Sequence, residues 1–156
     1  MVRFCVESGS VINAPAKEVY DVLADYNKGH PRIMPPQFFD GMRVLKGSGV
    51  GEGTRIEARF NVYGNKETLL MDVSEPEKGR VLQEIDSKAT NITRFIVDPI
   101  DDSTTCNVTI QTKVMKMQGI GAGLDMWIKK IVLKKIYVEE LKMLNQFMES
   151  KRAIKP

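Results

Sequence analysis

The chain has 156 residues, of which 42% are hydrophobic and 28% are charged. This composition is typical of one folded, soluble domain and excludes a disordered chain. Two cysteines and one histidine cannot form a disulfide-rich scaffold or a zinc site with four Cys or His ligands, so we expect no metal and no other cofactor. They also leave His30 as the only histidine available to a hydrolase of the Ser-His-Asp or Cys-His kind, which argues against a hydrolase.

The net charge of +3 is unevenly distributed along the chain. Residues 126–156 hold eight basic and three acidic side chains, whereas residues 1–125 carry a net charge of −2. Charge this mild does not indicate nucleic-acid binding. A terminal helix with a solvated lysine face explains the basic segment, and contact with an anionic membrane surface or a partner is the alternative.

The first elements are a strand and a helix. Residues 2–12 alternate between apolar and polar side chains, which predicts a strand. A helix follows over about residues 13–26, because its apolar residues recur every three or four positions. Glycine and three prolines within residues 27–36 keep any second helix short.

From Met42 to Met115 the hydrophobic period changes to two, which predicts a meander of six antiparallel strands. The clearest alternation lies at residues 55–62, 67–73, 80–86, 90–97 and 105–114. The glycines of the segment KGSGVGEGT (46–54) do not have the spacing of a phosphate-binding or dinucleotide-binding loop. They predict a turn with positive φ angles.

A long helix over about residues 121–150 is the only remaining element that can cover the apolar face of the sheet. Its apolar residues lie on two faces, one around Trp127 and Ile131 and one from Leu133 to Met148, whose centres differ by about 150°. Either the helix bends near Val132, or the first face contacts something other than the sheet. The predicted fold is α+β over residues 1–156: a strand, two short helices, the meander, and a C-terminal helix gripped by a curved sheet.

No segment has the roughly 18 uncharged apolar residues that span a membrane, and the first residues lack the features of a signal peptide. We therefore expect a cytoplasmic protein. Cys5 lies on the outward parity of its strand and Cys106 on the inward parity of its own, so the two cannot form a disulfide. Free thiols suit a reducing cytosol.

Four segments carry a resemblance to a known superfamily: INAPAKEVYDVLADY (12–26), GEGTRI (51–56), VSEPEKGRVLQEID (73–86) and IYVEEL (136–141). With the order of elements, they resemble the START/polyketide cyclase-dehydrase/birch-pollen-allergen-like (SRPBCC) superfamily over about residues 3–150. The resemblance implies the helix-grip fold, with a cavity between the concave face of the sheet and the last helix. Its members transport lipids, bind hydrophobic ligands, catalyse cyclisation or act as co-chaperones, so the fold does not determine the function.

On this resemblance we expect the cavity to bind a small hydrophobic molecule, such as a lipid, a polyketide-like compound or an aromatic compound; a core filled by side chains is the alternative. The predicted ligand-binding residues are His30, Met34, Phe38, Phe39, Phe60, Met71, Phe95, Val108, Leu124, Trp127 and Ile128. No nucleic-acid partner is expected. A peripheral membrane or homodimer contact through the C-terminal helix stays open.

His30 is expected at the mouth of the cavity, where it could bind a carbonyl or hydroxyl group. It is also the one candidate catalytic residue of a cyclase or dehydratase, as acid or base, with Asp25 and Asp40 the nearest groups to orient it. The absence of a full acid–base motif argues against an enzyme. A co-chaperone-like or membrane-surface interaction domain is a further alternative. Thr93, Tyr20 and Tyr26 are weaker candidate polar anchors.

Overall fold

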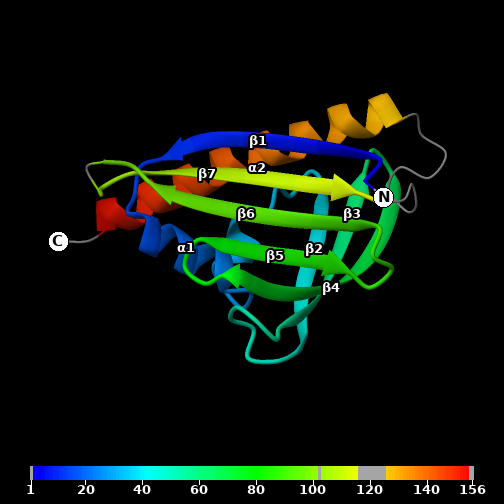
Figure 1. Cartoon of the computed structure of the whole chain (residues 1–156), viewed down its shortest axis with the longest axis horizontal. Coiled ribbons are helices and arrows are strands. Elements are labelled where there is room, and N and C mark those ends of the chain that lie inside the picture. Colours follow the sequence, from blue (N-terminus) through cyan, green and yellow to red (C-terminus); the bar gives the residue numbers. More distant parts are fainter. Residues whose placement is uncertain (1, 102, 116–125, 155–156) are drawn as a thin grey trace.

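The computed structural model describes residues 2–101, 103–115 and 126–154 (Figure 1). In chain order its elements are β1 (Phe4–Ile12), α1 (Ala16–Ala24), the 3-10 helix η1 (His30–Ile33), β2 (Phe39–Lys46), β3 (Arg55–Val62), β4 (Asn65–Glu77), β5 (Val81–Asp86), β6 (Asn91–Pro99), β7 (Cys106–Val114) and α2 (Met126–Ile154). The seven strands form one antiparallel sheet in the order β1-β7-β6-β5-β4-β3-β2. This arrangement confirms the predicted α+β helix-grip fold.

The sheet is a meander from β2 to β7, and β1 joins it beside β7. Inward and outward residues alternate along β7, so that Val108 and Ile110 are buried and the residues between them are partly exposed. β2 begins at Phe39, which pairs with Phe60, and not at Met42 as the alternation predicted. A register shift directly after Phe39 interrupts the alternation there and explains the error.

The glycine-rich segment between β2 and β3 is a turn with positive φ angles, as predicted. Its backbone binds the end of α1: Tyr26 N–H donates to the Gly49 carbonyl at 2.8 Å, and Gly51 N–H donates to the Ala24 carbonyl at 2.9 Å. A Cβ at Gly49 would collide with the Asn27 side chain. The turn therefore needs glycine there, and it fixes the backbone that carries Tyr26.

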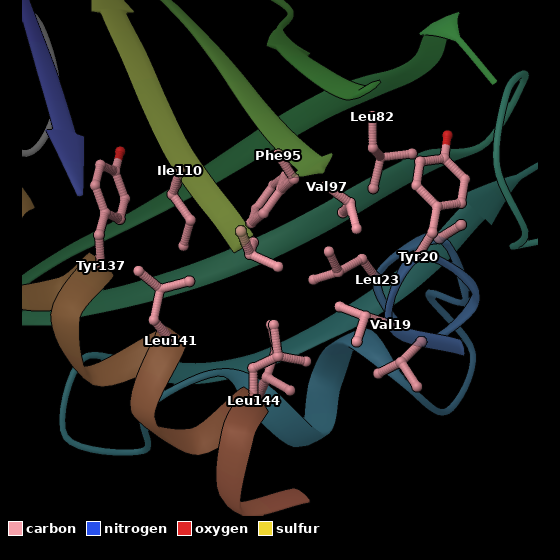
Figure 2. Packing of buried hydrophobic residues seen from close by; sticks show 14 of the residues in the cluster. Val19, Tyr20, Leu23, Leu82, Phe95, Val97, Ile110, Tyr137, Leu141 and Leu144 are labelled. Atoms are coloured by element: carbon pink, nitrogen blue, oxygen red, sulfur yellow. The ribbon is translucent and has the colours of Figure 1, made fainter. Parts of the chain in front are cut away.

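The hydrophobic core lies where α1 and the second half of α2 meet the sheet. Figure 2 shows Leu141 and Leu144 of α2 facing the sheet residues Ile110 and Phe95, with Leu23 of α1 beside them. Each of these side chains is at most 2% exposed. This close packing holds the second half of α2 against the inner face of the sheet, behind which the helix lies in Figure 1.

α2 is helical without interruption from Met126 to Ile154. Its second apolar face, which includes Ile136 and Tyr137, is buried against the sheet. Its first face is not: Trp127 is 69% exposed and Ile131 is 57% exposed. Of the two readings of this helix, the structure therefore favours a first face that does not pack on the sheet. No helix among the described residues is both long and apolar enough to cross a bilayer.

Both cysteines are free thiols, as predicted. Cys5 is exposed, and Cys106 is fully buried. Burial raises the pKa of the Cys106 thiol to about 11, so that it is neutral at physiological pH.

Candidate ligand cavity and its buried polar cluster

A cavity of about 90 Å³ lies between the inner face of the sheet and α2, large enough for several water molecules. Its apolar lining consists of Met34, Phe39, Met42, Phe60, Leu69, Met71, Phe95, Leu133 and Ile136. Its polar lining consists of His30, Glu67, Glu84, Asp86, Asn91, Thr93, Thr112, Lys129, Tyr137 and Glu140. The residues come from nearly every strand, from η1 and from α2. The helix-grip arrangement thus creates the cavity.

His30 lies inside the cavity wall and is only 3% exposed. Its ring stacks on Tyr26 at 4.6 Å between centroids and meets Phe95 edge-on at 5.2 Å. Its Nδ1 lies 2.7 Å from the Leu23 carbonyl oxygen. A carbonyl oxygen only accepts, so Nδ1 carries the proton and donates it. In the neutral ring Nε2 is then an acceptor, and it lies 3.7 Å from Oε1 of Glu84.

The prediction that Asp25 or Asp40 orients His30 was wrong. The Asp25 carboxylate accepts hydrogen bonds from the backbone N–H groups of Asn27 and Lys28. Asp40 is exposed on β2. The short η1 turns the imidazole inward, and the partners that fix it are the Leu23 carbonyl and Glu84. The ring is therefore part of the interior and not an exposed group at a cavity mouth.

Glu84 is the centre of a buried polar cluster. It lies on β5, two residues beyond the buried Leu82, and is 6% exposed. The Tyr26 hydroxyl donates to Glu84 Oε1 at 2.7 Å. Burial first, and then the charge of Glu84, raises the pKa of Tyr26 well above its ordinary value, so the phenol keeps its proton and acts as a donor.

Glu140 faces the same cavity from α2. It is 5% exposed, and its Oε2 has no hydrogen-bond partner among the described residues. Burial, and to a lesser degree the charge of Glu84, holds the pKa of Glu140 well above its ordinary value. Burial therefore favours the protonated form of this carboxyl group, which can both donate and accept a hydrogen bond inside the cavity.

Hydroxyl groups form a second polar strip beside Glu140. Thr93 and Thr112 face each other across β6 and β7, with 2.7 Å between their hydroxyl oxygens. Thr112 also shares a hydrogen bond with the hydroxyl of Tyr137. Burial raises the pKa of Tyr137 above its ordinary value, so its phenol stays protonated.

A third group of polar lining residues lies near the turn between β5 and β6. Asp86 accepts a hydrogen bond from the Thr90 hydroxyl at 2.7 Å and others from the backbone N–H groups of the turn. The side-chain oxygen Oδ1 of Asn91 is buried and has no partner among the described residues. Lys129 of α2 is 4% exposed, and burial lowers the pKa of its ammonium group. The described residues hold no group of three acidic, His or Cys side chains placed for a metal ion.

The structure brings six of the predicted ligand-binding residues together around the cavity: His30, Met34, Phe39, Phe60, Met71 and Phe95. Phe38 and Val108 are buried in the core but do not line the cavity. Trp127 and Ile128 are exposed on α2, at 69% and 45%. Leu124 lies outside the described residues.

Of the three weaker candidate anchors, two reach the cavity and one does not. Thr93 lines the cavity, and Tyr26 reaches it through its hydrogen bond to Glu84. The Tyr20 hydroxyl donates instead to Glu75 at 2.6 Å, away from the cavity lining.

Sequence reasoning missed the two buried glutamates, although the signals were available. Glu84 lies on the same strand parity as Leu82 and Asp86, so the segment VLQEID places two carboxylates on the inner face. Glu140 lies four residues from Ile136 and four from Leu144, within the buried stripe of α2. Acidic residues at inward positions in both elements would have predicted a buried carboxyl pair.

No family model and no curated protein matches the chain. Solved structures do. A KanY protein is 21% identical, with a TM-score of 0.78 over 96% of this chain and 99% of that chain. A START superfamily protein from Mycobacterium smegmatis is 13% identical, with a TM-score of 0.75 over 94% and 97%. The Zhui aromatase/cyclase from a Streptomyces species is 19% identical, with a TM-score of 0.73 over 97% and 96%. The chain therefore has the helix-grip fold of these proteins.

Proposed function

We propose that the chain binds a small hydrophobic molecule, of the lipid, polyketide-like or aromatic kind, in the cavity between the sheet and α2. We further propose that the molecule carries a hydroxyl group. The observation that carries the proposal is the pair of buried oxygens without partners, Glu140 Oε2 and Asn91 Oδ1, in a cavity with a large apolar lining. A ligand hydroxyl in the cavity would form a hydrogen bond with one of these oxygens, worth about 0.5–1.5 kcal/mol net.

The lining supplies both parts of the binding energy. Its phenylalanines and methionines bury apolar ligand surface at roughly 25 cal/mol per Å². Methionine side chains also adapt to irregular ligands. Its few inward polar groups would fix the orientation of the ligand, as is usual in small-molecule sites. The fold shared with START superfamily proteins is compatible with this use of the cavity.

The experiment is a calorimetric titration with 2-naphthol, an aromatic molecule with one hydroxyl group. We expect wild-type protein to bind it and the variant Leu133→Trp to lose binding at least tenfold, on the order of 1.4 kcal/mol, because the larger side chain fills the cavity. Val138→Trp is the matched control, since Val138 is exposed on the same helix. Equal affinities of the two variants would rule out the cavity as the binding site.

A second candidate function is acid–base catalysis of a cyclisation or water loss, which the convergence of His30, Glu84 and Glu140 favours. In a dehydration, Nε2 of His30 would take a proton from the carbon beside a carbonyl. That C–H electron pair would form the new double bond as the neighbouring C–O bond breaks. The protonated Glu140 would give its proton to the leaving hydroxyl, which departs as water, and the proton on His30 would later restore Glu140.

His30→Gln separates this candidate from simple binding. A catalytic histidine predicts that the variant loses turnover of a β-hydroxy ketone by about 100-fold or more while it keeps its affinity for the compound. Parallel losses of turnover and affinity would assign His30 a structural role only. The readouts are substrate consumption and the dissociation constant, measured on the same preparation.

A further inference from the structure

The first half of α2 carries an exposed apolar ridge, which we define as Trp127, Ile131 and Val138. These residues are 69%, 57% and 47% exposed. At 100° per residue they lie within about 40° of one another around the helix axis. The ridge therefore runs along one line of the helix, on the side opposite to the residues that pack on the sheet.

Lysines flank this ridge on both sides. Lys134 precedes it around the helix and Lys135 follows it, and both side chains are exposed. Lys130 lies further around the helix and is partly buried, with its Nζ 5.4 Å from the centroid of the Phe4 ring. No acidic residue occurs from Met126 to Val138. The surface is therefore apolar along its centre and positive along its edges.

An exposed aromatic residue extends the same surface. Tyr63, in the turn between β3 and β4, is 68% exposed. Its hydroxyl lies 3.2 Å from Nζ of Lys135, and its ring centroid lies 5.8 Å from the same nitrogen. The turn thus places Tyr63 next to Lys135 of α2.

We propose that this surface docks on an anionic phospholipid bilayer, with the ridge and Tyr63 in the interfacial region and the lysines on the lipid phosphates. Apolar and aromatic side chains bordered by lysines are what a helix lying in a bilayer interface requires. A second copy of the chain fits less well. Two-fold pairing of the ridges would bring the lysine rows of both copies together, and like charges at such a contact are costly.

The docking surface and the cavity share the same helical turns. Lys129 and Leu133 line the cavity from the inner side of the segment whose outer side carries Trp127 and Ile131. Docking would therefore hold the cavity one helix diameter, about 10–12 Å, from the bilayer. This inference goes beyond ligand binding and does not depend on it, because vesicle binding needs no occupant in the cavity.

The test is co-sedimentation with vesicles of phosphatidylcholine alone and of phosphatidylcholine mixed with phosphatidylserine. We expect sedimentation with the mixed vesicles only, release by added salt, and a blue shift of the fluorescence of Trp127, the only tryptophan. The double variant Lys134→Ala/Lys135→Ala should lower vesicle affinity about 25-fold, at about fivefold for each lysine. Ile131→Ser should weaken binding without changing the net charge.

Lys17→Ala/Lys78→Ala is the matched control, because it removes the same charge from exposed positions on α1 and on the turn between β4 and β5. We expect it to change vesicle affinity by less than about threefold, since charges more than a Debye length from the surface are screened. Equal effects of the two double variants would overturn the proposal. Equal binding to both kinds of vesicle would also overturn it. So would a protein that binds no vesicles but forms a dimer in ultracentrifugation, if Ile131→Ser abolishes that dimer.

Discussion

Replacing Glu140 by glutamine is expected to stabilise the protein by about 1–3 kcal/mol at about pH 8 and to change its stability little at about pH 4. The carboxyl group is buried with one oxygen unpaired, and burial together with Glu84 raises its pKa in the folded state. In the unfolded chain it titrates at about 4.3. The folded form is therefore favoured in acid, and this contribution is lost as the pH rises from about 4 toward the raised pKa. Glutamine stays neutral throughout, so the variant escapes that loss.

Urea denaturation of both proteins across this pH range measures the effect. Glu139→Gln is the control, since Glu139 is the neighbouring residue on α2 and is not buried. It should alter stability by less than about 0.5 kcal/mol. If the stability of the Glu140→Gln variant varied with pH in parallel with that of wild type, the Glu140 carboxyl group would not have the raised pKa of a buried acid.

Replacing Leu144 by alanine is expected to destabilise the protein by about 2–5 kcal/mol. Leu144 is 1% exposed and belongs to the core cluster that contains Ile110 of β7 and Leu23 of α1. Alanine would leave a cavity at the point where the helix is held against the sheet. Because total stability is typically about 5–15 kcal/mol, this change removes a large fraction of it.

Thermal and urea unfolding measure this loss, with Val138→Ala as the control on the exposed face of the same helix. The control should stay within about 0.5 kcal/mol of wild type. If both variants lost the same small amount, the second half of α2 would not be the part of the helix that the sheet grips.

Much of this fold could be predicted because its elements have strong local periods. The alternation of Cys106, Val108 and Ile110 predicts β7 within one residue of its observed bounds. The stripe from Ile136 to Met148 predicts the buried face of α2. Elements were misplaced where the period is interrupted, as at the start of β2, where a register shift follows Phe39.

The candidate site was harder to predict, because its residues meet only in the folded chain. Glu84 and Glu140 come from β5 and α2, and no local pattern pairs two elements so far apart in sequence. His30 is a similar case. It was predicted at the mouth of the cavity, yet the backbone of η1 and the Leu23 carbonyl hold its ring inside. The pattern of hydrophobic residues therefore predicted the apolar lining of the cavity better than it predicted the polar lining.

The most direct test of hydroxyl recognition in the cavity compares the affinities of 2-naphthol and naphthalene for the wild-type protein by calorimetry. The two molecules differ by one hydroxyl group, and the cavity holds buried oxygens of Glu140 and Asn91 that lack partners. We predict that 2-naphthol binds about fivefold to tenfold more tightly, the value of one hydrogen bond of about 1 kcal/mol, and that Glu140→Leu removes most of this advantage. Equal affinities of the two molecules, or no binding of either, would contradict a cavity built to hold a hydrophobic molecule by a polar group.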